Sequence, residues 1–192
     1  AFGARAAYAL WLAPLARLVL PPVPVEAPVP QIIIQTGAAT ASALQPGAAA
    51  WPLASILLAL WLAGAALFLA WHLVRYRRFL AEMLEHARPI AAPGIGDAAV
   101  LESPVVRGPA ATGLIARRIF VPTGFAQGFS AEERELALMH EALHHRRGDL
   151  WASAVALVVL SLHWFNPIAF AAHRAFRCDL EAACDASVVE RR

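Results

Sequence analysis

The stretch WPLASILLALWLAGAALFLAW, residues 51–71, decides how this chain folds. It is almost continuously apolar and lies inside a longer stretch, residues 27–74, that contains no Asp, Glu, Lys or Arg. A helix needs about 20 apolar residues to cross the hydrocarbon core of a bilayer. Trp51 and Trp71 suit the two membrane interfaces, where tryptophan is enriched. We therefore predict a transmembrane helix over residues 51–74 rather than a buried helix of a soluble core.

The composition of the whole chain agrees with a membrane protein. Hydrophobic residues make up 59% and charged residues 16% of its 192 residues, whereas soluble domains contain about 25% charged residues. The net charge is only +2 and the basic residues form no long block, so we expect no direct nucleic-acid binding. We expect the lipid bilayer to be one partner of the chain.

The segments on either side of the predicted span differ in charge. Three arginines occur within residues 75–78, whereas residues 21–50 contain one charged residue, Glu26. Because basic residues stay on the cytosolic side, we expect residues 21–50 to be an extracytoplasmic Pro/Ala-rich loop and residues 75–192 to be a cytosolic domain. Residues 1–20 are interrupted by proline, and we predict that they form a first, truncated transmembrane helix.

Beyond the span, the pattern changes to that of a domain with both helices and strands. The spanning helix should continue to about residue 87 and stop before Pro89. Short, partly β-branched stretches at residues 98–102, 111–116 and 118–121 predict strands, because proline and glycine separate them.

A capping box predicts where the next helix begins. Ser130 caps the helix, and Glu133, three residues on, reaches back to the backbone of the serine. The helix should run to about Arg147, with Gly148 as its stop.

Two more helices are predicted after this one. Residues 150–164 form an apolar run that is short for a span, so we expect this helix to pack on or near the membrane. We expect Asp149 to cap it. Residues 168–189 should form the final helix, after the break at Asn166 and Pro167.

The helix that begins at Ser130 carries the motif HEALH, residues 140–144. His140 and His144 stand one turn apart on one face, so their two imidazoles can reach one zinc ion. Glu141 lies at the edge of that face, where it can deprotonate the attacking water. The alternative is a pair of surface histidines on an amphipathic helix. The capped helix start and the preceding strands favour the zinc site.

A catalytic zinc ion needs three protein ligands and one open position. One class of zincins supplies the third ligand from HxxGxxH, a pattern that is absent here. Another class takes a glutamate from a later helix, and Glu181 fits better as this ligand than as part of a solvated helix face. Asp185 lies on the same face as Glu181 and can accept the free ring N–H of a histidine. We therefore predict His140, His144 and Glu181 as zinc ligands, with Glu141 as the catalytic base.

The stretches HEALHHRRGDLW and HWFNPIAFAAHRAFRCDLEAACDASVV resemble the BlaR/MecR-type regulatory metallopeptidases of bacteria. The resemblance covers most of the chain, and its most specific parts are HExxH and the Glu-x-x-Cys-Asp that begins at Glu181. It implies a mainly α integral membrane protein with a zincin-like α+β protease domain. In that domain a small antiparallel sheet accompanies the HExxH helix and the glutamate helix.

The resemblance also implies a function. It predicts a membrane-embedded, zinc-dependent endopeptidase of the bacterial inner membrane that cleaves itself or a cytosolic repressor during transmembrane signalling. The substrate should add as a strand to a sheet edge within residues 111–121, and a homodimer is left open. Two alternatives stand beside this one: a housekeeping membrane protease of the CaaX-protease or HtpX kind, and a non-catalytic signalling or scaffold module.

Overall fold

The computed structural model describes residues 3–19, 50–91 and 97–191. The predicted loop over residues 21–50 therefore lies outside the described residues, except for its last position. The elements, in chain order, are α1 (Ala4–Leu10), α2 (Leu12–Val19), α3 (Ala50–Glu85), β1 (Arg88–Pro89), β2 (Ala99–Ser103), β3 (Ala110–Thr112), β4 (Arg118–Pro122), α4 (Phe125–Gly128), α5 (Ala131–Arg147), α6 (Asp149–Leu162) and α7 (Pro167–Val189).

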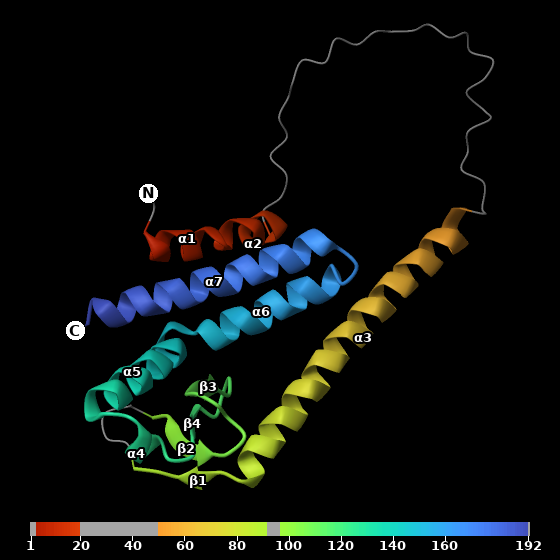
Figure 1. The fold of residues 1–192 in the computed structure, drawn as a ribbon. Coiled ribbons are helices and arrows are strands. Elements are labelled where there is room, and N and C mark those ends of the chain that lie inside the picture. The colour runs from red at the N-terminus through yellow and green to blue at the C-terminus, as the bar shows by residue number, and fades with distance from the viewer. Residues whose placement is uncertain (1–2, 20–49, 92–96, 192) are drawn as a thin grey trace, which may run out of the picture.

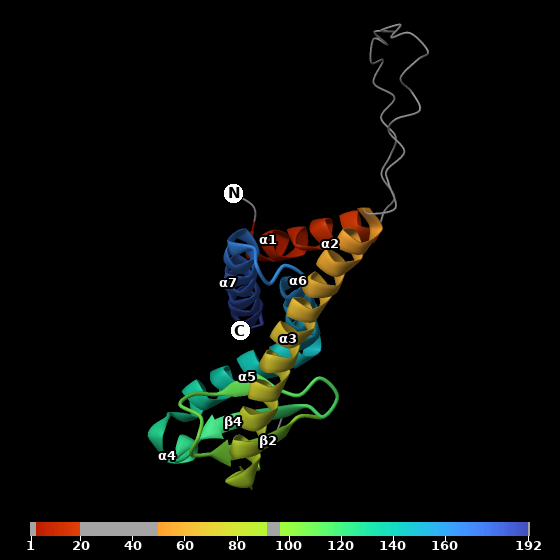
Figure 2. The same ribbon diagram turned by 90° about the vertical axis from the view of Figure 1, so that its right-hand side faces the viewer.

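Helix α3 contains the predicted span and continues beyond it without a break, as expected, to Glu85. Among the described residues, one helix, Pro52–Glu85, is long and apolar enough to cross a membrane. Its most apolar window has a mean hydropathy of 2.4, and only 6% of that window is buried inside the protein. Figure 1 and Figure 2 show α3 running from the sheet, past α6, to the opposite end of the described structure.

The first twenty residues do not form one continuous helix. The described part divides into α1 and α2, which meet at Trp11. Helix α1 lies along α7 (Figure 1). Polar side chains join α1 to α7: the Trp11 indole N–H donates to Asp179 at 2.8 Å, and Arg5 pairs with Glu190 at 2.5 Å. A membrane helix over residues 1–20 stays a prediction.

The sheet is mixed, so the prediction of a purely antiparallel sheet is wrong. Its strand order is β1-β2-β4-β3. Strands β1 and β3 each pair antiparallel with a neighbour, whereas β2 and β4 pair parallel. The cause is the path of the chain. After β2 the chain skips the neighbouring position in the sheet and forms β3 at the edge. It then returns as β4, between β2 and β3.

A glycine makes the tight return from β3 to β4. Gly113 has a φ of +85°, and a Cβ added there would lie 2.0 Å from the carbonyl oxygen of Ala116. Only glycine fits this position. The turn ends β3 at Thr112, which is why the strand predicted over residues 111–116 is shorter in the structure.

The central strand β4 joins the two helical parts of the protein. Ile119 and Val121 pack in a cluster that the α5 side chains cover, whereas Phe120 points to the other face and packs on Met83 near the end of α3. These three residues of β4 are completely buried. The sheet therefore holds α5, which carries HEALH, at a fixed position relative to the end of the long helix.

Candidate metal centre

Helix α5 begins and ends where the sequence predicts. Ser130 and Glu133 make both hydrogen bonds of the capping box, and Gly148 ends the helix in the left-handed conformation with a φ of 75°. The next helix, α6, starts directly after this glycine. The turn at Gly148 therefore brings the first residue of α6 close to the last turn of α5.

Three predicted metal ligands converge on one point between α5 and α7. The Nε2 atoms of His140 and His144 are 3.1 Å apart. The Oε2 atom of Glu181 lies 3.6 Å from the first of these nitrogens and 3.5 Å from the second. Ligand atoms about 2.0–2.1 Å from a tetrahedral zinc ion stand about 3.3 Å from one another. The three donor atoms are therefore already spaced much as zinc requires.

A carboxylate holds the other nitrogen of each histidine ring. Asp185 Oδ1 lies 3.1 Å from Nδ1 of His140, and Asp149 Oδ2 lies 2.8 Å from Nδ1 of His144. Such a carboxylate orients the ring and favours the tautomer in which Nε2 is free to bind a metal. The structure thus gives Asp185 the kind of contact that the sequence predicts for it.

Asp149 does not cap α6, contrary to expectation. Gly148 occupies the cap position, and the Asp149 side chain instead turns toward α5. Asp149 is 1% exposed and is also contacted by Arg147 Nε at 3.3 Å and by the Tyr8 hydroxyl at 3.4 Å. Its buried charge is therefore paired, as buried charges must be.

Replacing Asp149 with asparagine should lower zinc affinity by about 10- to 100-fold, the usual effect of losing a carboxylate behind a histidine ligand. Competition with a chromogenic chelator measures this change. The control is Asp179→Asn, which alters an aspartate of α7 that bonds to Trp11 instead of a histidine. Equal affinities in the two variants would show that Asp149 does not support the site.

Cys184 is a site residue that was not predicted from the sequence. It is completely buried, and its ligand atom lies within 4.8 Å of ligand atoms of both His140 and His144. Its position three residues after Glu181 puts it on the same face of α7, which is the signal that could have found it. Its thiol donates to the backbone carbonyl of His140 at 3.6 Å.

Glu181 and Cys184 therefore compete for the role of third ligand. We favour Glu181 because its oxygen is almost equally far from both Nε2 atoms, at separations close to those of a tetrahedral site. The Cys184 thiol would have to give up its hydrogen bond to bind a metal. Half of the Glu181 side chain is exposed, so its carboxylate can turn toward an ion without unpacking the core.

The surroundings of the two histidines raise the pKa of both rings. Burial lowers the pKa of His144, but hydrogen bonds with Asp149 and Cys184 and the nearby negative charges outweigh it and raise the pKa to about 10. The pKa of His140 is also raised, chiefly by its hydrogen bond with Cys184. Burial acts to raise the pKa of Cys184, yet its hydrogen bonds with the two histidines bring the pKa below its ordinary value.

Zinc affinity should therefore depend steeply on pH. Below a pKa of about 10, zinc must displace the proton of His144, because only the neutral imidazole binds a metal. Each unit of decrease in pH should weaken the apparent affinity by at least about tenfold. Chelator competition at several pH values around neutrality measures the slope. A zinc affinity that does not change over this pH range would contradict the displacement of a proton from His144.

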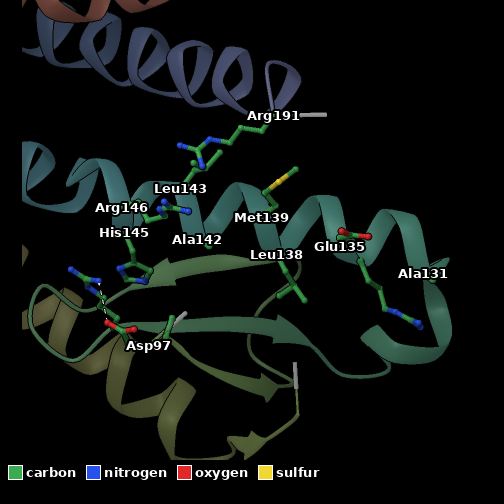
Figure 3. A pocket seen from close by; sticks show the side chains of 13 residues that line it. Asp97, Ala131, Glu135, Leu138, Met139, Ala142, Leu143, His145, Arg146 and Arg191 are labelled. Carbon is green, nitrogen blue, oxygen red and sulfur yellow. Dashed lines mark ion pairs between the residues drawn. The ribbon is translucent and has the colours of Figure 1, made fainter. Parts of the chain in front are cut away.

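Two residues that are neighbours of the predicted histidine ligands in sequence, Glu141 and His145, contact the sheet. Glu141 Oε2 accepts the backbone N–H of Ala111 in β3 at 2.6 Å. His145 Nε2 lies 3.1 Å from the carbonyl oxygen of Arg118 in β4, so the ring that directly follows His144 in sequence points toward the sheet (Figure 3). Glu141 is thus placed between the donor cluster and the edge strand of the sheet.

A cavity of about 700 Å³ lies beside α5 but does not include the donor cluster. Figure 3 shows Leu138 and His145 pointing from α5 toward the sheet, with Arg191 approaching from the end of α7. Asp97 and Arg117 form an ion pair of 3.7 Å at its rim. None of the predicted ligands lines this cavity, so the convergence of donor atoms, rather than the cavity, marks the functional site.

Comparisons with known proteins identify the family of this chain. The family described as BlaR1 peptidase M56 matches residues 1–192. The chain is also similar to the "Regulatory protein BlaR1" of Bacillus licheniformis, with 28% identity over 88 residues. That match covers 46% of this chain and 14% of the relative, so it spans a small part of the longer protein. The whole-length match shows that the chain belongs to the BlaR1 peptidase M56 family.

Proposed function

We propose that this chain is a zinc-dependent endopeptidase of the bacterial inner membrane whose site faces the cytosol. The observation that carries the proposal is the convergence of His140 Nε2, His144 Nε2 and Glu181 Oε2 on one point. Membership of a peptidase family supports it, and the match over the whole chain favours this kind of membrane protease over the CaaX-protease or HtpX kind.

The residues present fit a zinc ion. Two imidazole nitrogens and one carboxylate oxygen are typical donors for a catalytic zinc site that keeps one position open. A zinc ion held by His140, His144 and Glu181 would supply a Lewis acid for a peptide carbonyl and would lower the pKa of a bound water. The carboxylates of Asp149 and Asp185 keep both rings turned toward the site.

Glu141 acts as the general base and then as the general acid. Its carboxylate takes a proton from the attacking water and later delivers a proton to the nitrogen of the leaving amine. The backbone N–H of Ala111 donates to one of its oxygens at 2.6 Å. This contact holds the side chain at the edge of the sheet, where a peptide would lie.

The edge at which a substrate can add is β3. Strand β4 is paired on both sides, by β2 and by β3, so the part of the expected edge over residues 118–121 lies inside the sheet. Within the described residues, β3 has a strand on one side only. The Ala111 N–H points away from β4 toward Glu141. A peptide that extends the sheet beside β3 would therefore pass next to the catalytic carboxylate.

The protein substrate is a cytosolic regulator, such as a repressor, or the chain itself. Two features support this choice: the similarity to a protein described as regulatory, and the arginines that follow the apolar part of α3. Basic residues at this end favour a cytosolic position for the sheet, α5 and the metal centre. The span itself is supported by the length and hydropathy of α3.

The test is cleavage by the full chain in lipid nanodiscs, followed by mass spectrometry of the chain and of an added peptide library. We expect cleavage with zinc, loss of cleavage after chelation, and recovery when zinc is added back. A zinc-loaded chain that cuts neither itself nor any peptide would support the non-catalytic alternative. Cleavage that persists in chelator without zinc would rule out a metallopeptidase.

A further inference from the structure

The turn between α6 and α7, residues 163–166, lies against the middle of the long helix α3. We call this turn the elbow. The ring of Trp164 covers Gly64 so closely that a Cβ added to the glycine would lie 2.4 Å from it. The indole N–H of Trp164 donates to the carbonyl oxygen of Trp61 at 3.3 Å. Phe68 and Phe170 extend the contact with an edge-to-face ring pair.

The position of Gly64 gives the depth of the elbow. With a rise of about 1.5 Å per helical residue, Gly64 lies about 10 Å from Trp71 and about 20 Å from Trp51 along α3. The hydrocarbon core is about 30 Å thick. If α3 spans the bilayer, the elbow therefore lies within the hydrocarbon core and not at the cytosolic surface.

The residues on both sides of the elbow suit contact with lipid. No Asp, Glu, Lys or Arg occurs between Asp149 and Arg174. One stripe of α6 exposes large apolar side chains at helical spacing, namely Trp151, Val155, Val158 and Leu162. Phe165 and Ile168 follow with exposed fractions of 62% and 74%. A contiguous apolar surface of this kind is rare on a protein that faces water.

The elbow also satisfies many of its own backbone polar groups. The Trp61 indole N–H donates to the carbonyl oxygen of Leu162 at 2.8 Å. His163 Nδ1 lies 2.9 Å from the carbonyl oxygen of Val159. The side chain of Asn166 accepts the N–H of Ile168 at 2.9 Å. Inside a bilayer, backbone groups must find such partners within the protein because no water is present.

We propose that α6 and the first half of α7 form a re-entrant hairpin that enters the bilayer from the cytosolic side and turns at the elbow. Its exposed stripe contacts lipid acyl chains. The proposal rests on α3 being a membrane span. It goes beyond the expected helix on or near the membrane, because it also places the start of α7 in the hydrocarbon.

The hairpin joins the bilayer to the metal centre. Asp149 is the first of the 14 residues of α6, so it lies about 20 Å from the elbow. Glu181 lies at a similar distance along α7, on the returning side. The two arms therefore bring the carboxylate behind His144 and the third metal ligand back to the same level, at the cytosolic base of the hairpin.

Thiol labelling tests this depth in membranes that contain the full chain. The background is Cys178→Ser, since Cys178 is exposed and Cys184 is buried. Phe165→Cys probes the elbow, Leu67→Cys probes an exposed position of α3, and Ile115→Cys probes the loop after β3, where the side chain is 89% exposed. A charged, membrane-impermeant maleimide is applied to inverted vesicles and to spheroplasts.

We expect Ile115→Cys to be labelled rapidly in inverted vesicles. Phe165→Cys and Leu67→Cys should react at most about one tenth as fast from either side, because a thiol in hydrocarbon does not ionise to the reactive thiolate. All three should react after denaturation. Rapid labelling of Phe165→Cys with protection of Leu67→Cys would overturn the hairpin and leave the span intact. Rapid labelling of Leu67→Cys would overturn the span and the hairpin together.

Discussion

Replacing Glu141 with glutamine should abolish peptide cleavage without removing zinc. Glutamine keeps the size of the side chain and can still accept the Ala111 N–H, which Glu141 accepts at 2.6 Å. It cannot take a proton from water at neutral pH. The rate should fall by about 100- to 10,000-fold, the usual contribution of a positioned acid or base. Cleavage of the full chain in nanodiscs, with metal analysis of the same sample, measures both effects.

The matched control for Glu141→Gln is Glu135→Gln. Glu135 lies on the same helix, is exposed, and lines the cavity away from the donor cluster. The control should cleave at the rate of the unmodified chain and bind the same amount of zinc. If Glu141→Gln also cleaves at that rate, Glu141 is not the base and the mechanism fails.

Replacing His144 with alanine should remove zinc binding and, with it, activity. The change deletes one of three ligands and leaves the buried carboxylate of Asp149 without its closest partner. Zinc affinity should fall by more than about 100-fold, which exceeds the usual effect of losing a carboxylate behind a histidine ligand. Chelator competition gives the affinity, and thermal unfolding in chelator shows whether the metal-free variant is folded.

His145→Ala is the control for this change because it alters the neighbouring imidazole. His145 contacts the Arg118 carbonyl at 3.1 Å and lies away from the three donors. It should keep zinc affinity within a few-fold, although it loses a contact between α5 and the sheet. Equal loss of zinc in the two variants would show that the metal is not held by the HEALH face that carries His140 and His144.

Local rules explain the features that the sequence predicted well. The capping box at Ser130, the stop at Gly148 and the uninterrupted α3 each depend on residues within a few positions of one another. The spacing of Glu181 and Asp185 by one helical turn likewise allows both to face one site. The HEALH helix could therefore be placed, and its partner residues named, without knowledge of the tertiary structure.

The features that were wrong or missing depend on the path of the chain in three dimensions. The parallel pairing of β2 with β4 requires that the intervening strand β3 lie at the edge, beyond β4. The residue pattern of the strands does not reveal this arrangement. Asp149 turns back to His144 only because Gly148 adopts a left-handed conformation between two helices. The packing of α7 on α5 buries Cys184 close to the two histidines, and its spacing from Glu181 shows only that the two residues share a face of α7.

The break between α1 and α2 at Trp11 also depends on the three-dimensional path of the chain. The apolar composition of the first segment suggests a membrane helix, but Arg5, Tyr8 and Trp11 each make a polar contact with a residue of α6 or α7. Tyr8 reaches Asp149 directly. The contacts of Arg5 and Trp11 hold α1 against α7.

The zinc K-edge X-ray absorption spectrum of the full chain, loaded with one equivalent of zinc, tests the central claim most directly. We predict a first shell of nitrogen and oxygen at about 2.0–2.2 Å, with the scattering pattern of two imidazoles. This shell is the one that His140, His144 and Glu181 would provide, with one position left for water. A sulfur atom at about 2.3 Å would put Cys184 in the place of Glu181 and contradict the account.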